Sequence, residues 1–200
     1  IAYDDKDYGA AYDYYLKLRA SPSRRPPRGL ASNGLMKSGF NSGKFQAASQ
    51  YADTLISLPA VSADVKNDAF YYKAKSLQQF DSSDAAAKIY KQLSTNKNGD
   101  IAAESRYHIA EILYKQEKYK EAETAANEAI KQSAGYDYWI VKSYILLADI
   151  LVKENDFFNA KATLQSIITH TKIAELKQEA VKKLKDVKAL EKSKSKLSEE

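Results

Sequence analysis

The chain of 200 residues contains no cysteine. Disulfide bonds, thiol catalysis and cysteine-ligated metal sites are therefore excluded. Glycine (7) and proline (4) are also scarce. Because proteins built from many short strands need turn residues more often, this scarcity favours helices. No run of about 18 apolar residues occurs, so the sequence predicts no membrane-spanning segment.

Side chains that could carry chemistry are few and scattered. The two histidines, His108 and His170, lie on different parts of the repeat pattern described below. No glycine-rich phosphate loop and no serine in a nucleophile-elbow context is present. The carboxylates alternate with lysines, as on solvated helix faces. We therefore predict that the protein is not an enzyme and has no catalytic residue, no metal site and no cofactor.

The overall charge is mildly positive. Hydrophobic residues make up 44% and charged residues 28% of the chain, which is typical of ordinary globular proteins. A formal net charge of +5 favours an acidic partner by itself, but it is too small to require nucleic acid. We expect a protein or peptide partner, and no nucleic acid.

A repeat of about 37 residues organises most of the sequence. Five segments align on a small residue, with spacings of 36 to 38 residues: Ala11, Ala48, Ala86, Ala122 and Ala160. In the third segment, Ser83 stands three positions before the small residue. The other four segments have an aromatic residue at that place: Tyr8, Phe45, Tyr119 and Phe157. A second helical pattern precedes four of these segments, with its own equivalent positions: Met36, Ala74, Ala110 and Ala148.

The apolar residues of both patterns recur at helical intervals. In one stretch, for example, Ile109, Ala110, Leu113 and Tyr114 share a face. Two helices of a hairpin approach closely where small residues meet, and one hairpin cannot bury its own apolar face, so hairpins must stack. The predicted fold class is all-α, a right-handed superhelical solenoid of antiparallel helix pairs with about ten helices.

The pattern resembles the tetratricopeptide repeat. The resemblance is carried best by residues 112–130, with Tyr119, Ala122 and Ala129, and by residues 146–168, and it extends roughly from residue 6 to 170. The period exceeds the usual length of about 34 residues. Met36 and Ala126 also depart from the family pattern. The resemblance implies a binding scaffold whose concave groove is lined by the first helix of each pair.

We divide this single tetratricopeptide-like domain into seven segments. They are an orphan second helix of a truncated repeat at 1–20, a proline- and arginine-rich loop at 21–28, repeats at 29–59, 60–97, 98–135 and 136–171, and a capping helix with a tail at 172–200. The cap carries one apolar stripe: Ile173, Leu176, Ala180, Leu184 and Val187.

The N-terminal helix has no partner before it. Tyr12, Tyr15 and Leu16 are expected on an uncovered apolar face. We therefore expect the chain to be a C-terminal fragment of a longer protein with a further repeat upstream, or a protein that self-associates through this helix.

Residues 19–28, RASPSRRPPR, hold four of the five arginines and three of the four prolines. Pro26 and Pro27 prevent a helix there. The segment is interpreted as a loop without a role, as a stretch foreign to the natural sequence, or as a basic linker for phosphate or an acidic peptide.

Outward positions of the first helices define the predicted partner-binding groove. Tyrosine favours such surfaces because it buries a large area with few rotors. The candidate residues are Lys37, Tyr71, Lys75, Gln78, Glu104, Tyr107, Glu111, Tyr114, Lys142 and Asp149. A lysine–asparagine clamp for C-terminal carboxylates is not matched, because its positions hold Asn33, Lys37, Tyr72 and Glu104.

The leading functional prediction is a non-catalytic protein–protein interaction scaffold. The alternatives are a structural arm or assembly subunit of a larger cell-envelope complex, and the non-catalytic part of an enzyme whose active domain lies upstream. The long period and the lysine-, tyrosine- and asparagine-rich composition resemble tetratricopeptide proteins of Bacteroidetes-type bacteria. That resemblance implies a periplasmic or outer-membrane-associated location, with the cytoplasm as the alternative.

Overall fold

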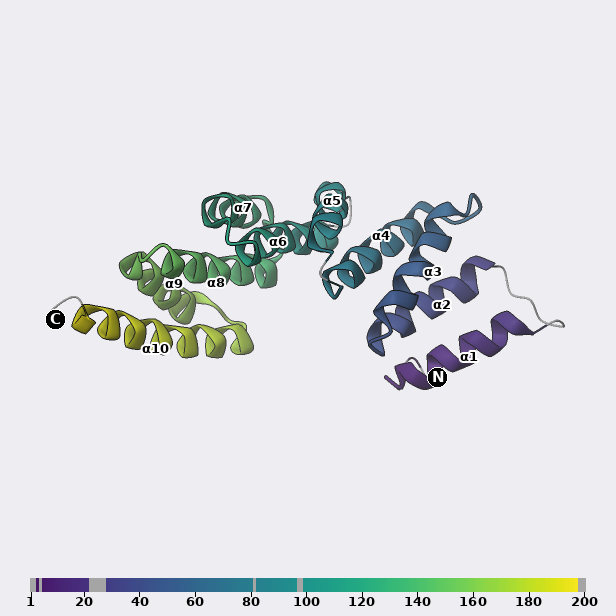
Figure 1. The fold of residues 1–200 in the computed structure, drawn as a ribbon, viewed down its shortest axis with the longest axis horizontal. Coiled ribbons are helices and arrows are strands. Elements are labelled where there is room, and N and C mark those ends of the chain that lie inside the picture. Colours follow the sequence, from purple (N-terminus) through teal and green to yellow (C-terminus); the bar gives the residue numbers. More distant parts are fainter. Residues whose placement is uncertain (1–2, 4, 22–27, 81, 97–98, 198–200) are drawn as a thin grey trace. The chain divides into compact units, whose positions relative to one another are not determined.

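The structure is a computed structural model that describes residues 3, 5–21, 28–80, 82–96 and 99–197 (Figure 1). Within these ranges it consists of ten helices and no strand, so the predicted all-α class is confirmed. The helices are α1 (Tyr8–Ala20), α2 (Arg28–Asn41), α3 (Phe45–Ser57), α4 (Ala63–Gln78), α5 (Ser83–Leu93), α6 (Gly99–Lys115), α7 (Tyr119–Gln132), α8 (Asp137–Lys153), α9 (Phe157–His170) and α10 (Ala174–Leu197). None of them, over the part of each that is described, is long and apolar enough to cross a membrane.

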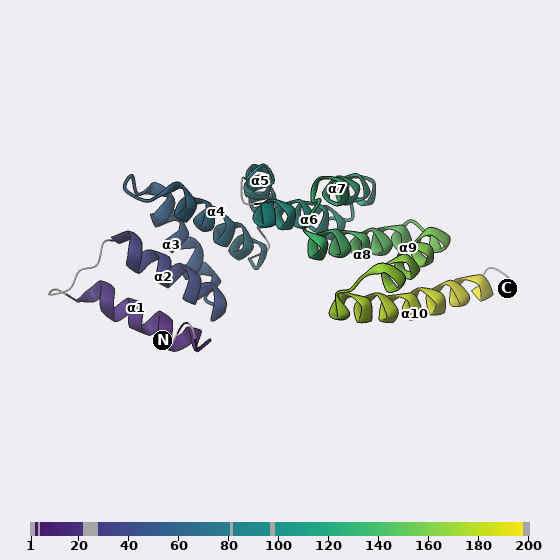
Figure 2. The ribbon, with the colours of Figure 1, turned by 180° about the vertical axis from the view of Figure 1, so that it is seen from behind.

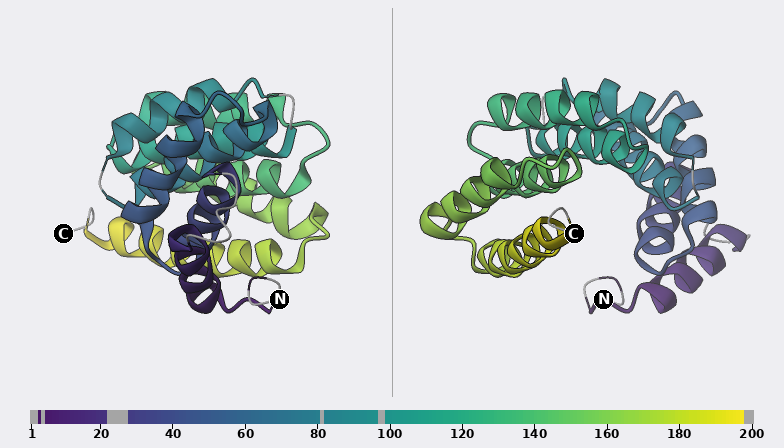
Figure 3. Two further views of the ribbon diagram at one scale, coloured as in Figure 1. Left: turned by 90° about the vertical axis from the view of Figure 1, so that its right-hand side faces the viewer. Right: turned by 60° about the vertical axis from the view of Figure 1, so that its left-hand side comes forward.

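The chain divides into two compact units, Ile1–Leu93 and Ser94–Glu200, here called unit 1 and unit 2. Within each unit every helix packs on the next one along the chain (Figures 1 and 2). In unit 1, α2 also contacts α4, and in unit 2, α8 contacts both α6 and α10. Unit 2 therefore has one layer formed by α6, α8 and α10 and a second layer formed by α7 and α9 (Figure 3).

The same turn precedes four of the second helices. A residue with positive φ stands two positions before each opening aromatic: Lys6 (60°), Gly43 (78°), Glu117 (60°) and Asn155 (65°). Three of these turns close through an amide that donates to a carbonyl five residues earlier: Lys44 to Gly39 (2.8 Å), Lys118 to Leu113 (3.0 Å) and Asp156 to Leu151 (2.8 Å). This is a left-handed helix end that satisfies terminal carbonyl groups. Because the turn recurs, each second helix leaves its first helix in a similar way.

Small residues occupy the closest helix crossings, as the repeat predicts. Of the five aligned alanines of the second helices, Ala11 is 2% exposed. The other four are fully buried: Ala48, Ala86, Ala122 and Ala160. The equivalent positions of the first helices are buried as well: Met36, Ala74, Ala110 and Ala148. A larger side chain at these places would push the helices apart, so the packing of each unit depends on them.

Helix α10 covers the apolar side of α8 and α9. Its predicted stripe is confirmed, with Leu176, Ala180, Leu184 and Val187 buried and Ile173 packed at the edge of the same cluster. That cluster includes Leu151 of α8 and Leu164 of α9. A single-sided apolar helix with a lysine-rich outer face closes the stack at this end.

The N-terminal helix exposes less apolar surface than the sequence suggests. Tyr12 is only 8% exposed, and its ring packs edge-on against that of Tyr51 of α3, with 6.5 Å between the ring centres. Tyr15 lies against Gly34 of α2, where a Cβ atom would collide with the tyrosine ring. Only Leu16 of the three expected residues is exposed. The expectation fails for the two tyrosines because a glycine and a neighbouring aromatic ring make room for them on α2 and α3.

The proline- and arginine-rich loop lies largely outside the described residues, which omit 22–27. On its flanks, Arg28 begins α2, and Arg19 lies 5.3 Å from the centre of the Tyr51 ring. Helix α2 begins one residue before the predicted repeat segment 29–59.

A substitution within α9 tests the role of the crossing alanines. Ala160→Leu is expected to lower the free energy of unfolding by about 1–3 kcal/mol, because the added atoms cannot fit between α8, α9 and α10. Ala162→Leu, on the exposed side of the same helix, is the matched control and should change it by less than about 0.5 kcal/mol. Urea titration followed by circular dichroism measures both; equal effects would contradict the crossing role of Ala160.

Candidate functional site

Four of the ten predicted groove residues lie in unit 1, and all four are half-buried. Lys37 of α2 donates to Asp68 of α4 at 2.6 Å, and its ammonium group lies 5.9 Å from the centre of the Tyr72 ring. The ion pair therefore connects two first helices across one layer. An ammonium group near an aromatic face is also attracted to the ring itself.

Lys75 of α4 lies between two aromatic rings. Its ammonium group is 4.8 Å from the centre of the Tyr71 ring and 5.5 Å from that of Phe40, and it donates to the Tyr71 hydroxyl at 2.9 Å. Gln78, one turn further on, accepts a hydrogen bond from Tyr90 of α5 at 2.8 Å. Unit 1 therefore presents lysines held over aromatic rings.

The other six predicted residues lie in unit 2, and two of them are not exposed as expected. Glu104 is 6% and Tyr107 8% exposed. The Tyr107 ring packs on Trp139 of α8, with 5.6 Å between the ring centres. Outward positions on an isolated α6 thus become interior once α8 stacks on it. Tyr114, by contrast, is half-buried beside Tyr119, at a centroid distance of 5.9 Å.

His108 lies between two carboxylates of its own helix. Its Nε2 is 3.4 Å from Glu104 Oε1, and its Nδ1 is 3.0 Å from Glu111 Oε2. Burial would lower the pKa of His108, but the hydrogen bonds to Glu104 and Glu111 and their charges raise it above its usual value. Burial would raise the pKa of Glu111, but the hydrogen bond and charge of His108, together with Lys115 at 3.2 Å, lower it to about 2. The two carboxylates therefore favour the protonated form of His108.

Two ion pairs connect α8 with α10. Lys142 donates to Glu179 at 3.4 Å and also lies 5.7 Å from the centre of the Tyr107 ring. Lys183 donates to both carboxylate oxygens of Asp149 at 2.8 Å. Burial raises the pKa of Asp149, and Lys183 lowers it only in part. All four charged side chains are about one-quarter to one-third exposed, so water screens them less than it screens surface pairs.

We call this continuous set of contacts the α6/α8/α10 face. It comprises Glu104, Tyr107, His108 and Glu111 of α6, Tyr138, Trp139, Lys142 and Asp149 of α8, and Glu175, Glu179 and Lys183 of α10. Tyr138 joins it at the exposed rim, 5.0 Å from Trp139 between ring centres. Burial, and then the charges of Glu175, Glu179 and Glu104, raise the pKa of Tyr138, so three carboxylates act on this hydroxyl.

Six members of the face are not among the residues predicted from the sequence: His108, Tyr138, Trp139, Glu175, Glu179 and Lys183. A signal for His108 was present, since Glu104, His108 and Glu111 are spaced by four and three residues and must share one helix face. Glu179 and Lys183 were interpreted as solvated residues of the cap. Their pairing depends on how α10 lies on α8, which the sequence of α10 alone does not specify.

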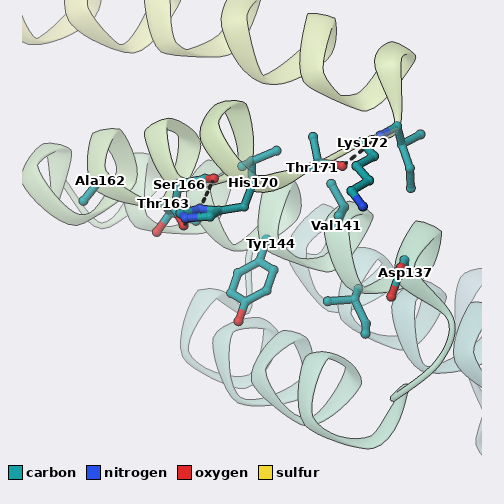
Figure 4. Close-up of a pocket in the computed structure, with 12 residues that line it drawn as sticks. Asp137, Val141, Tyr144, Ala162, Thr163, Ser166, His170, Thr171 and Lys172 are labelled. Carbon is teal, nitrogen blue, oxygen red and sulfur yellow. Dashed lines mark hydrogen bonds between the residues drawn. The ribbon is translucent and has the colours of Figure 1, made fainter.

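A separate pocket of about 640 Å³ lies between α8, α9 and the residues before α10 (Figure 4). Its wall combines apolar side chains such as Ile140 and Ile167 with polar ones. His170 Nδ1 lies 2.9 Å from the Ser166 carbonyl, which only accepts hydrogen bonds. Nδ1 therefore carries the proton, and this nitrogen cannot act as a base toward Ser166.

Within the described ranges, no group of three or more histidine, aspartate or glutamate side chains is arranged to hold a metal ion. The contacts of the α6/α8/α10 face pair acids with bases and stack rings on rings. Charged and aromatic side chains in such an arrangement have the chemistry to contact charged and aromatic groups of another molecule.

The pH dependence of stability tests the His108 cluster. A raised histidine pKa stabilises the fold below the usual value of about 6.5, and this contribution is lost as the pH rises through the raised pKa. The lowered pKa of Glu111 stabilises it above about 4.5, and this contribution is lost as the pH falls toward 2. His108→Gln should therefore cost about 1–3 kcal/mol near pH 5.5 and clearly less near pH 9.

Urea unfolding of the wild type and His108→Gln at these two pH values measures the difference. His170→Gln, a change of the exposed histidine at the end of α9, is the control and should have little effect at either pH. A His108→Gln cost that does not change with pH would show that the imidazolium does not hold the cluster together.

No protein-family model matches the chain, and no curated protein matches it in sequence. Among solved structures, the crystal structure of BtubC (BKLC) from P. vanneervenii is similar, with a TM-score of 0.60 and 15% sequence identity. The similarity covers 92% of this chain and 89% of that one. It concerns the fold alone, and it agrees with the all-helical architecture.

Proposed function

We propose that the chain is a tetratricopeptide-like repeat protein that binds a segment of another protein on its α6/α8/α10 face. The repeat spacing, the recurring left-handed turn and the alanines at the helix crossings support the family assignment. The observation that carries the binding proposal is the unbroken set of contacts across α6, α8 and the capping helix α10, from the His108 cluster through Tyr107 and Lys142 to Glu179.

The face has the properties of a preorganised binding surface. Its charged groups are already held by neighbours, so little side-chain entropy remains to be lost when a partner binds. Tyr138 stands at the rim as a large, 40% exposed aromatic side chain with a polar tip. Tyrosine and tryptophan are the residues on which binding energy is most often concentrated.

A rival explanation is that these contacts serve only to hold α6, α8 and α10 together. The two explanations differ at Tyr138. This residue belongs to none of the described hydrophobic clusters and is 40% exposed, whereas a partner lying across the face would cover it further. Tyr144, on the same helix and 38% exposed, borders the pocket of Figure 4 and lies outside the face.

Site-specific crosslinking at these two tyrosines tests the proposal. A photoreactive phenylalanine analogue at position 138 should capture one defined protein in cells of the source organism, identified by mass spectrometry, and the analogue at position 144 should not. With that protein purified, Tyr138→Ala should weaken binding by about tenfold, because an aromatic side chain that a partner covers is worth roughly 1–2 kcal/mol.

Tyr144→Ala is the matched control and should leave the affinity unchanged. Both variants should keep the circular dichroism spectrum and thermal midpoint of the wild type, since both side chains are exposed. Equal capture at positions 138 and 144, or an affinity that Tyr138→Ala does not change, would refute binding at this face.

A further inference from the structure

The α6/α8/α10 face differs in charge from the rest of the chain. The contacts of this face include those of Asp100, which accepts a hydrogen bond from Trp139 at 3.1 Å, and of Lys115, which pairs with Glu111. With these two, the described contacts of the face involve six carboxylates against three lysines and His108. The carboxylates are Asp100, Glu104, Glu111, Asp149, Glu175 and Glu179, and the lysines are Lys115, Lys142 and Lys183, so carboxylates outnumber the basic groups even when His108 is protonated. The chain as a whole carries +5, so the acidic excess is local.

The repeat itself places charge at one position of this layer. The residue that follows the crossing position of each first helix is charged and half-buried: Lys37, Lys75, Glu111 and Asp149. In unit 1 both residues are lysines, and in unit 2 both are acids. Equivalent positions thus give the two units opposite sign, and the acidic character of unit 2 follows from where its repeats place carboxylates.

We infer that the α6/α8/α10 face takes a lysine- and arginine-rich segment of its partner. This inference rests on the proposed function, because it names the partner chemistry for the same face. The argument is charge complementarity combined with aromatic rings, since ammonium and guanidinium groups are attracted both to carboxylates and to ring faces.

The chain's own lysines indicate how such a segment would be held. Lys142 is bound by Glu179 on one side and by the Tyr107 ring on the other. Lys183 is bound by both oxygens of Asp149. The face therefore already accommodates two ammonium groups, which reach it from α8 and α10.

The carboxylates of the face also act on two tyrosine hydroxyl groups. After burial, the charges of Glu111, Glu179 and Asp149 raise the pKa of Tyr107. The pKa of Tyr138 is raised in the same way by carboxylates of α6 and α10. Carboxylates of α6, α8 and α10 therefore act on both hydroxyl groups, one interior and one at the rim.

The closing experiment measures binding of two peptides to the full chain by fluorescence anisotropy. One is a fluorescein-labelled peptide of about 15 residues with lysine at every second position, and the other has glutamate at the same positions. The lysine peptide should bind, and the glutamate peptide should bind at least about tenfold more weakly. Raising the NaCl concentration from about 50 to about 300 mM should weaken binding of the lysine peptide, because salt screens the charges that attract it.

Two variants with the same change in net charge locate the site. Glu175→Lys, at the exposed rim near Tyr138, should lower the affinity for the lysine peptide by about tenfold. Glu128→Lys, exposed on α7 in the other layer, should leave the affinity at the wild-type value. Circular dichroism and thermal unfolding confirm that both variants are folded.

Each outcome decides the inference. Equal weakening by the two variants would mean that only net charge matters, and it would overturn the inference. Stronger binding of the glutamate peptide, or no binding of the lysine peptide, would overturn it as well. A crosslinked partner at position 138 that contacts the face through an acidic segment would leave the proposed function standing and refute the basic segment alone.

Discussion

The close approach of helices at buried alanines is the constraint on which the rest of this structure depends. A pair such as α8 and α9 has an apolar surface that it cannot cover by itself. Ala148 and Ala160 let the two helices meet closely, and α10 then closes the cluster with its own apolar stripe. A helix axis displaced at one crossing would shift the helices that pack on it within the same unit, so the positions of the polar side chains of α6, α8 and α10 depend on these small residues.

Within each unit, ion pairs also connect helices of the same layer. The helices of such a layer are not consecutive along the chain, because another helix lies between them in the sequence. Charged side chains span the distance: Lys37 reaches Asp68 in unit 1, and Lys142 reaches Glu179 in unit 2. Long, half-buried side chains suit this place because their stems cover apolar surface while their charged ends pair. Within each unit, these ion pairs therefore help to hold the layer together.

The sequence predicts the helices well because their apolar periodicity is local. Tyr119 and Phe157 each open a helix, as the repeat indicates, since an aromatic at that place follows a fixed turn. The face is predicted less completely because it arises from stacking. Tyr107 reads as outward on its own helix, and only the neighbouring Trp139 makes it interior. The pairing of Glu179 depends likewise on where α10 lies, which no pattern within α10 specifies.

The positive net charge of the chain would favour an acidic partner, whereas the carboxylates of the face would favour a basic one. Which of the two matters more depends on how far each set of charges lies from the bound segment. At physiological salt, charges are screened over about 8 Å. The excess of +5 is spread over a chain of 200 residues, whereas the carboxylates around Tyr107 and Tyr138 act at contact range and from partly buried positions. A basic segment lying on the face would therefore interact mainly with these carboxylates and only slightly with the lysines of the outer surface. The sign of the surface in contact, and not the sum over the chain, selects the partner.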